Sequence, residues 1–284
     1  MTLGKYPFLF RQCHALARIL VSPSHVRCRG EMNLPALKTA FATVVCFAMA
    51  GAAAAQEAPV TPAVPPVTTF SSVAYAGVDI RERSYYGYAG LIRALNGNIA
   101  TNGFLVRGSV LYGEYDYTLP VVGGVIDGDV TAFSALVGYQ HFFQGLVGRV
   151  YAGVDYEDHD LTPDNPFDPN RGSDFGVMVR GELETQYSFN ALFYGSLVGI
   201  YGSAKERHWV RGRAGYNFGG IILGPEAIFT GNPVSDDTRF GAFAILRNPN
   251  LAPAEVSFYA GHSHTESIRG GSSMYGGVEL SLAF

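Results

Sequence analysis

Apolar residues alternate with polar or small residues along most of the chain after residue 70. In the stretch 174–186, for example, Phe175 shares one side with three other apolar residues, and Arg180, Glu182 and Glu184 share the other. Successive side chains of a β-strand point to opposite faces, so this period of two predicts strands with one apolar and one polar face. Such strands are typical of barrels that meet lipid on the outside and water on the inside.

Twelve alternating segments follow one another, separated by turn residues. They cover residues 71–83, 84–95, 103–117, 129–142, 147–159, 174–186, 191–203, 207–218, 220–230, 238–247, 254–263 and 273–284. The count is even, as in single-chain bacterial barrels. The sequence therefore predicts an all-β fold, a twelve-stranded antiparallel outer-membrane barrel over residues 70–284.

The connections differ in length, and this difference predicts which way the barrel is oriented. Extracellular loops of such barrels are longer than periplasmic turns. Most of the longer connections follow odd-numbered segments, so we expect them to be extracellular: residues 118–128, 160–173, 231–237 and 264–272. Two connections are exceptions, namely the tight first hairpin near residue 83 and the longer turn at residues 96–102.

The last segment ends the chain on an aromatic residue. Phe284 shares its side with Leu282 and Leu280, whereas Ser281 and Glu279 lie on the other side. A terminal aromatic residue on such a strand is what the bacterial barrel-assembly machinery recognises, so we expect that machinery as a partner.

The first 69 residues show no strand pattern. We interpret residues 1–31 as an upstream leader from a mis-assigned start, with an unusually long leader as the alternative. Residues 32–55 read as a signal peptide, with a short apolar stretch and alanines before cleavage after Ala55. Residues 56–69 hold four prolines and predict an extended, disordered periplasmic lead-in.

Cysteines and charge narrow the function. Cys13, Cys28 and Cys46 all precede the expected cleavage, so we expect no disulfide framework and no thiolate site in the mature chain. The leader removes six basic residues and one acidic residue, which leaves 14 basic and 23 acidic residues and a net charge of about −9. This balance argues against nucleic acid as a partner, because binding it requires cations that neutralise phosphates.

Charged and tyrosine side chains on the polar faces are the candidate functional residues, and we expect them to line the lumen. They are Arg107, Arg149, Tyr151, Asp155, Glu157, Arg180, Glu182, Glu184, Arg211, Arg213, Glu226 and Glu279. One reading is an ion-pair lattice that plugs a narrow barrel. The other is a polar passage suited to a sugar chain, whose C–H faces pack on aromatic rings and whose hydroxyls bond to charged groups.

Three further motifs suggest weaker alternatives. Glu182 and Glu184 lie two apart on one face, a spacing near that of inverting glycosidases. The acidic run from Asp155 into the loop 161–171 is rich in oxygen ligands and could hold calcium, although it lacks the spacing of an EF-hand. The run 262–264, His-Ser-His, could indicate a lipid-modifying barrel enzyme, but its serine points away from both histidines.

Several segments resemble the cellulose biosynthesis protein BcsS family. The most specific is YAGVDYEDHDLTPDNPFDPNRG at residues 151–172. It is supported by YYGYAGLIRALNG (85–97), GELET (181–185), RAGYNFGGIILGPEA (213–227), AEVSFYAGH (254–262) and YGGVELSLAF (275–284). The resemblance implies an outer-membrane component associated with bacterial cellulose production, and it carries over no catalytic or binding residue.

Together these observations predict a non-enzymatic envelope protein without cofactor or metal, exported through the periplasm to the outer membrane. It would support cellulose synthesis or secretion as an export or anchoring component. Its expected partners are outer-membrane lipid and lipopolysaccharide, with cellulose or cellulose-synthase components as further candidates. A small-solute porin remains the alternative, followed by the lipid-modifying enzyme.

Overall fold

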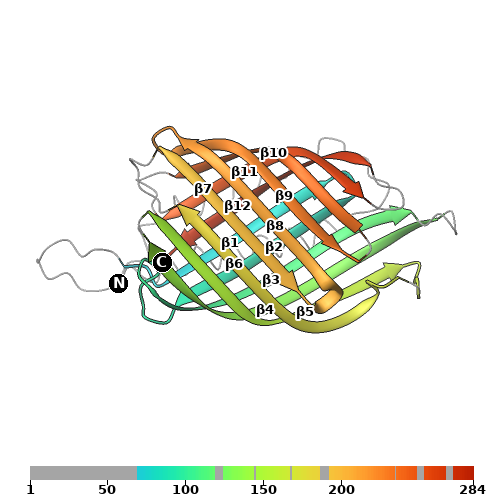
Figure 1. The fold of residues 1–284 in the computed structure, drawn as a ribbon. Coiled ribbons are helices and arrows are strands. Elements are labelled where there is room, and N and C mark those ends of the chain that lie inside the picture. Colours follow the sequence, from blue (N-terminus) through green and yellow to red (C-terminus); the bar gives the residue numbers. More distant parts are fainter. Residues whose placement is uncertain are drawn as a thin grey trace, which may run out of the picture. The chain divides into compact units, whose positions relative to one another are not determined.

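The computed structural model describes residues 69–118, 124–143, 145–166, 168–185, 192–233, 235–247, 253–266 and 271–284. The expected leader, the signal peptide and all but the last residue of the lead-in lie outside them. Twelve antiparallel strands form one closed barrel, as predicted (Figure 1). They are β1 Ser72–Arg81, β2 Ser84–Ala94, β3 Gly103–Thr118, β4 Val125–Phe143, β5 Leu146–Thr162, β6 Gly172–Thr185, β7 Phe193–Gly202, β8 Arg207–Asn217, β9 Ile221–Asn232, β10 Ser235–Arg247, β11 Ala254–Glu266 and β12 Ser272–Ala283.

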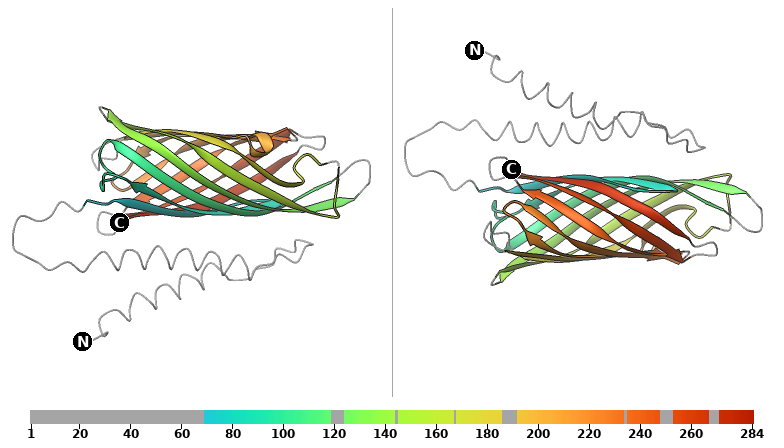
Figure 2. Two further views of the ribbon diagram at one scale, coloured as in Figure 1. Left: turned by 90° about the horizontal axis from the view of Figure 1, so that it is seen from below. Right: turned by 90° about the horizontal axis from the view of Figure 1, so that it is seen from above.

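Each strand pairs with its neighbours in the chain, and β1 pairs with β12 to close the ring. The closing register runs from Val73 opposite Ala283 to Arg81 opposite Tyr275. Two further views show the tilt of the strands and place the C-terminus beside the start of β1 (Figure 2). We call this end of the barrel the terminal end, and the end with the β1–β2 turn the distal end.

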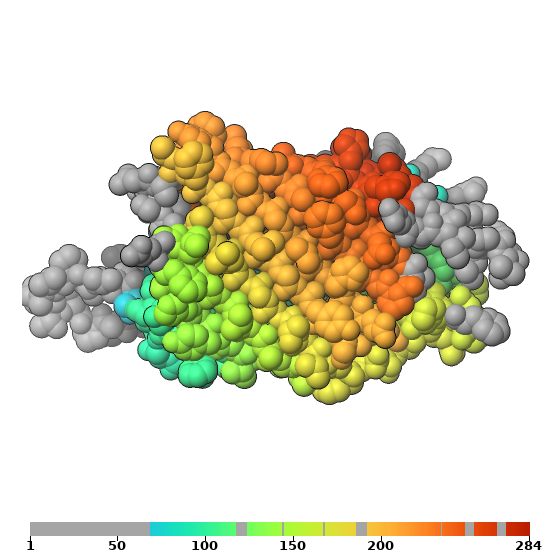
Figure 3. All heavy atoms as spheres, viewed as in Figure 1, coloured from blue at the N-terminus to red at the C-terminus, as the bar shows by residue number. Residues whose placement is uncertain are grey.

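The outer wall is apolar because the alternation holds along the strands. Large hydrophobic residues are exposed on it, among them Val150 at 64%, Phe175 at 68% and Val177 at 58%. Their neighbours of opposite parity, such as Tyr151 and Met178, are buried inside. The side chains of neighbouring strands meet along the wall shown in Figure 3.

Aromatic residues gather on the outer wall at two levels, as in the girdles of outer-membrane barrels. The pairs nearer the terminal end are Phe104 with Tyr139 and Phe193 with Tyr216, and those nearer the distal end are Phe133 with Tyr156 and Phe229 with Phe240. The band between these two levels is the part of the wall suited to hydrocarbon.

Three strands are longer than the rest and extend the barrel at its distal end. β3, β4 and β5 have 16, 19 and 17 residues, whereas a tilted strand of roughly 10 residues crosses a bilayer. Pairing continues to Thr118 opposite Val125 and to Asp127 opposite Thr162. These strands form the part of the barrel that reaches furthest in Figure 1.

The expected long loops are therefore shorter than predicted. The expected loop 118–128 loses its last residues to β4, and the expected loop 231–237 is wrong because β9 continues to Asn232 and β10 begins at Ser235. The acidic residues in these stretches resemble turn residues in sequence, but the ladder continues through them. Among the described residues, no helix is long and apolar enough to cross a membrane.

Candidate functional site

The inner face of the barrel carries a network of charged and aromatic side chains. The structure places all twelve sequence candidates at inward positions, and each contacts another inward side chain. These contacts pair Arg107 with Tyr151 and Glu182, Arg149 with Glu182 and Glu184, Arg180 with Glu182, Arg207 with Asp155 and Glu157, Arg211 with Glu279, and Arg213 with Glu226. The period of two was sufficient to place these residues on one face, and the barrel brings them together.

Glu182 is the centre of the network in the terminal half of the lumen. Its carboxylate accepts hydrogen bonds from Arg107 of β3 at 3.3 Å, Arg149 of β5 at 3.3 Å and Arg180 of β6 at 2.6 Å. Charge-assisted bonds of this kind are stronger than neutral ones. With three guanidinium groups around it, Glu182 is held as an ion-pair partner, which counts against the proton transfer that a glycosidase would need.

The same network crosses the lumen. Glu184 lies 3.5 Å from Arg149 and 3.5 Å from Arg247, and Arg247 also bonds Glu255 of β11. Arg247 belongs to β10, which is four strands away from β6 around the ring. A second bridge of the same span joins Arg211 of β8 to Glu279 of β12 at 3.6 Å. Both bridges therefore cross part of the lumen.

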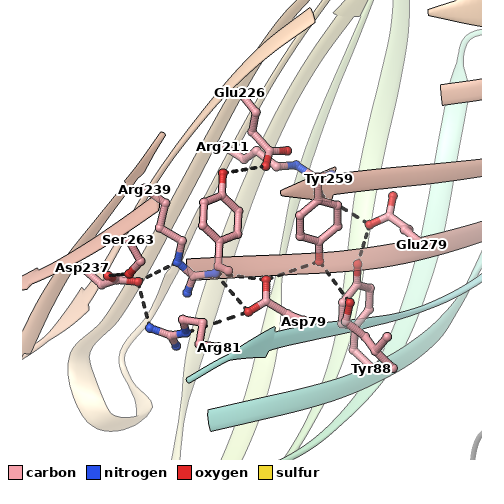
Figure 4. A network of polar contacts seen from close by, with 12 residues as sticks. Asp79, Arg81, Tyr88, Arg211, Glu226, Asp237, Arg239, Tyr259, Ser263 and Glu279 are labelled. Carbon is pink, nitrogen blue, oxygen red and sulfur yellow. Dashed lines mark hydrogen bonds and ion pairs between the residues drawn. The ribbon is translucent and has the colours of Figure 1, made fainter. Parts of the chain in front are cut away.

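Near the distal end a second cluster joins β1, β10 and β11 (Figure 4). Arg81 lies 2.9 Å from Asp237, and Arg239 lies 2.6 Å from Asp237 and 3.0 Å from Asp79. Ser263 also donates a hydrogen bond to Asp237. The sequence analysis did not name these two arginines and two aspartates as candidates. Each of them lies next to an exposed residue that points outward, and the same alternation identified the other inward residues.

Tyrosines add further hydrogen bonds to carboxylates between neighbouring parts of the inner face. Tyr88 donates a hydrogen bond of 2.6 Å to Glu279, and Tyr259 donates one of 3.3 Å to Asp79 (Figure 4). Tyr275 donates one of 3.3 Å to Glu226, which also pairs with a buried arginine of β8. These bonds join strands that are two or three positions apart around the ring.

Six of the inward tyrosines lie across a glycine of the neighbouring strand. The pairs are Tyr75 on Gly90, Tyr86 on Gly113, Tyr88 on Gly77, Tyr115 on Gly128, Tyr151 on Gly138 and Tyr259 on Gly277. A Cβ added to any of these glycines would approach the ring within 3.0 Å, closer than real Cβ atoms come. The glycines therefore allow the rings to lie against the barrel wall, as in aromatic rescue of glycine in sheets.

The distal half of the lumen beside β5 has fewer cations than carboxylates. Arg207 lies 2.9 Å from Glu157 and 3.6 Å from Asp155. Asp155 is 1% exposed, and neither carboxylate oxygen has a hydrogen-bond donor among the described residues. His159 bridges Glu157 at 2.8 Å and the hydroxyl of Tyr115 at 2.7 Å. One arginine here serves two buried carboxylates, unlike the three around Glu182.

The structure does not support the two remaining motifs. The run 155–160 lies within β5, so Asp155 and Glu157 face inward while Asp158 and Asp160 occupy outward positions. Among the described residues, no group of three or more potential ligands is placed to hold a metal ion. At the run 262–264, Ser263 is buried and bonded to an aspartate inside, with both histidines on the other face.

Several solved structures are similar to this barrel. An outer-membrane channel from Pseudomonas putida aligns over 80% of this chain and all of its own, with 13% identity and a TM-score of 0.50. A KdgM porin covers 75% of this chain and 99% of its own at 10% identity and a TM-score of 0.39. The beta domain of the Bordetella autotransporter Brka covers 76% and 100% at 13% identity and a TM-score of 0.42. No curated protein matches this chain.

Fold and inner face together define a closed antiparallel barrel of the outer-membrane type, with an apolar exterior and a charged interior. Within that class, the chain belongs to the cellulose biosynthesis protein BcsS family, whose model matches residues 73–284. The resemblance seen in the sequence is thereby confirmed.

Proposed function

We propose that this chain is a non-enzymatic outer-membrane barrel that supports cellulose biosynthesis as an anchoring component and not as an open export conduit. The observation that carries the proposal is the pair of bridges across the lumen, Glu184 to Arg247 and Arg211 to Glu279. Opening the second bridge would separate Arg211 from its carboxylate partner in a largely buried site, which is costly, whereas Glu184 and Arg247 would still be paired with Arg149 and Glu255. Family membership supplies the link to cellulose.

The orientation and partners follow from the same reasoning. Both described chain ends lie at the terminal end, which would face the periplasm as in other bacterial barrels. The apolar outer band would contact lipid and lipopolysaccharide. Phe284 accepts hydrogen bonds from the amides of Ser71 and Ser72, so the residue expected to engage the assembly machinery also completes the closing seam.

A small-solute porin is the second candidate, and one observation favours it. The side chains of Glu184 and Glu255 are each 28% exposed although they point inward, so water reaches part of the lumen. Small ions would need much less space than a sugar polymer. The two candidates therefore differ in conductance and in their effect on cellulose.

Deletion of the gene with measurement of surface cellulose tests the favoured function. We expect less surface-bound cellulose with unchanged uptake of small sugars and antibiotics. In planar bilayers, the purified protein should show little conductance, and the variant E182A/E184A should show more because it removes the carboxylates that hold four arginines. An unchanged cellulose yield in the deletion strain, or a large stable conductance of the unaltered protein, would contradict the proposal.

A matched complementation separates anchoring from export. The same E182A/E184A variant, returned to the deletion strain, should restore surface cellulose, because an anchor does not depend on a particular lumen width. An export conduit would respond to a wider lumen with altered secretion.

A further inference from the structure

Two tyrosine rings near the distal end differ from the other inward tyrosines. Tyr115 and Tyr117 share the inward side of β3, with ring centroids 6.2 Å apart and planes inclined by 21°. Both side chains are half-buried, so part of each ring meets solvent. His159 stands edge-on to Tyr115 at 5.7 Å. The two rings thus form a nearly continuous aromatic surface along the strand.

This aromatic surface is held in place by β4 behind the Tyr115 ring and by hydrogen bonds of both tyrosine hydroxyls. A Cβ at Gly128 would lie 2.5 Å from Cζ of Tyr115, so this ring rests directly on β4. The hydroxyl of Tyr115 bonds Nδ1 of His159 at 2.7 Å. The hydroxyl of Tyr117 donates a hydrogen bond to Asp168 in the β5–β6 connection. Rings held in this way lose little freedom when a ligand packs on them.

Elsewhere in the lumen, arginines cover comparable rings. Arg107 lies 4.5 Å from the ring centroid of Tyr75 and 5.9 Å from that of Tyr151, and Arg213 lies 5.4 Å from that of Tyr259. Among the described residues, no guanidinium group lies over Tyr115 or Tyr117. Within the described part of the chain, these two rings therefore lack the cation–π contacts that Tyr75, Tyr151 and Tyr259 make.

We propose that Tyr115 and Tyr117 form a stacking platform for a neutral glucan chain at the distal mouth of the barrel. The C–H faces of hexoses pack on aromatic rings, and their hydroxyls can bond neighbouring carboxylates. Asp168 provides such an acceptor beside the rings. The inference rests on the proposed function, for which it supplies the surface that would hold the polymer.

Charge selects a neutral chain over an acidic one. Asp155, Glu157 and Asp168 lie in this region, and Arg207 pairs with the first two. An anionic polysaccharide would bring further negative charge to this mouth of the barrel, where opposing carboxylates repel it. A glucan avoids this repulsion while keeping its hydroxyl groups.

Binding of cellohexaose to the purified full chain in detergent micelles, measured by calorimetry, tests the platform. The variant Y115A/Y117A should bind roughly tenfold more weakly or worse, whereas Y115F/Y117F keeps the rings and should stay within about threefold. Tyr112→Ala removes a tyrosine at an outward position of the same strand and serves as the control. An oligogalacturonate of equal length should bind more weakly than cellohexaose.

A second variant keeps both tyrosines and changes only their support. Gly128→Ala places a methyl group where the Tyr115 ring lies, and should weaken cellohexaose binding while Tyr112→Ala does not. Heat-modifiable migration on gels shows that each variant is folded. Equal affinity of Y115A/Y117A and the unaltered chain, tighter binding of oligogalacturonate, or no binding of cellohexaose by the unaltered chain would overturn the platform.

These outcomes are independent of the deletion experiment. If deletion lowers surface cellulose but cellohexaose does not bind, the platform is wrong and the proposed function stands. If cellohexaose binds through both rings but deletion leaves surface cellulose unchanged, the platform stands and the proposed function fails.

Discussion

The two halves of the lumen solve the problem of internal charge differently. In the terminal half, Glu182 is surrounded by three arginines from three strands, and its neighbour Glu184 is bridged across the barrel. In the distal half beside β5, Asp155 and Glu157 share Arg207. The terminal half is cross-linked by several arginines, whereas in this part of the distal half a single arginine, Arg207 of β8, is shared by two carboxylates of β5.

This difference relates stability to function within one fold. A carboxylate with several charge-assisted bonds fixes the strands that supply its partners, so the terminal half can act as the rigid, closed part of the barrel. A region with fewer internal partners keeps groups available for a ligand. We infer that closure and recognition are divided between the halves, which gives predictions that compare matched positions.

The largest expected difference is between Glu182→Gln and Asp155→Asn. Glu182→Gln leaves three arginines near a neutral group and should lower the free energy of unfolding by about 3–5 kcal/mol, the cost of breaking a buried ion pair. Asp155→Asn removes a buried charge without a hydrogen-bond donor and should leave stability unchanged or raise it. Denaturant unfolding in micelles, followed by tryptophan fluorescence, measures both.

The comparison would fail if both substitutions destabilised the barrel equally. Arg180→Ala provides a control, because it removes one of the three cations and leaves Glu182 with the other two. Its effect should lie between those of Glu182→Gln and Asp155→Asn.

A smaller difference is expected between two glycines that support tyrosines. At Gly138 a methyl group would meet both the Tyr151 ring and the carbonyl oxygen of Val150, and Tyr151 is 3% exposed. Gly138→Ala should therefore cost about 1–3 kcal/mol, as overpacking does. At Gly128 the three nearest atoms all belong to the outer end of the Tyr115 ring, which can turn toward the lumen. Gly128→Ala should cost less stability, measured by the same unfolding transition, and equal costs would show that both rings are equally confined.

The sequence was sufficient to predict which residues face inward but not which of them meet. Arg107 and Glu182 were placed on inward faces because their positions alternate with those of the apolar residues in the same strands. Their contact depends on how the ring closes, and a period of two contains no information about strands that are three or four positions apart. For the same reason the bridge from Glu184 to Arg247 could not be predicted, although the parity of Arg247 was readable.

Strand ends were harder to predict than strand faces. The segment at Asp127 and Gly128 resembles a turn in sequence, because acidic residues and glycine favour turns. In the structure Asp127 occupies an outward position of β4 and remains paired with β3 and β5. Above the aromatic level an outward position no longer meets hydrocarbon, so the alternation of apolar and polar residues that marks a membrane strand disappears there while the backbone ladder continues.

The smallest effect on stability is expected at the exposed ion pair of Arg171 and Asp164, whose distances are similar to that of the buried pair Arg180–Glu182. Arg171 bonds Asp164 through two nitrogens at 2.5 and 2.7 Å, much as Arg180 approaches Glu182 at 2.6 Å. The Asp164 carboxylate raises the pKa of Arg171 through these bonds, so the guanidinium stays charged in any ordinary buffer. Both side chains are nonetheless exposed, at 47% and 60%, and water competes for the same groups. Arg171→Ala should leave the unfolding midpoint unchanged within error and lose no cellohexaose affinity. A loss of stability as large as that of Glu182→Gln would show that bond geometry, and not burial, separates the rigid half of the lumen from the rest of the molecule.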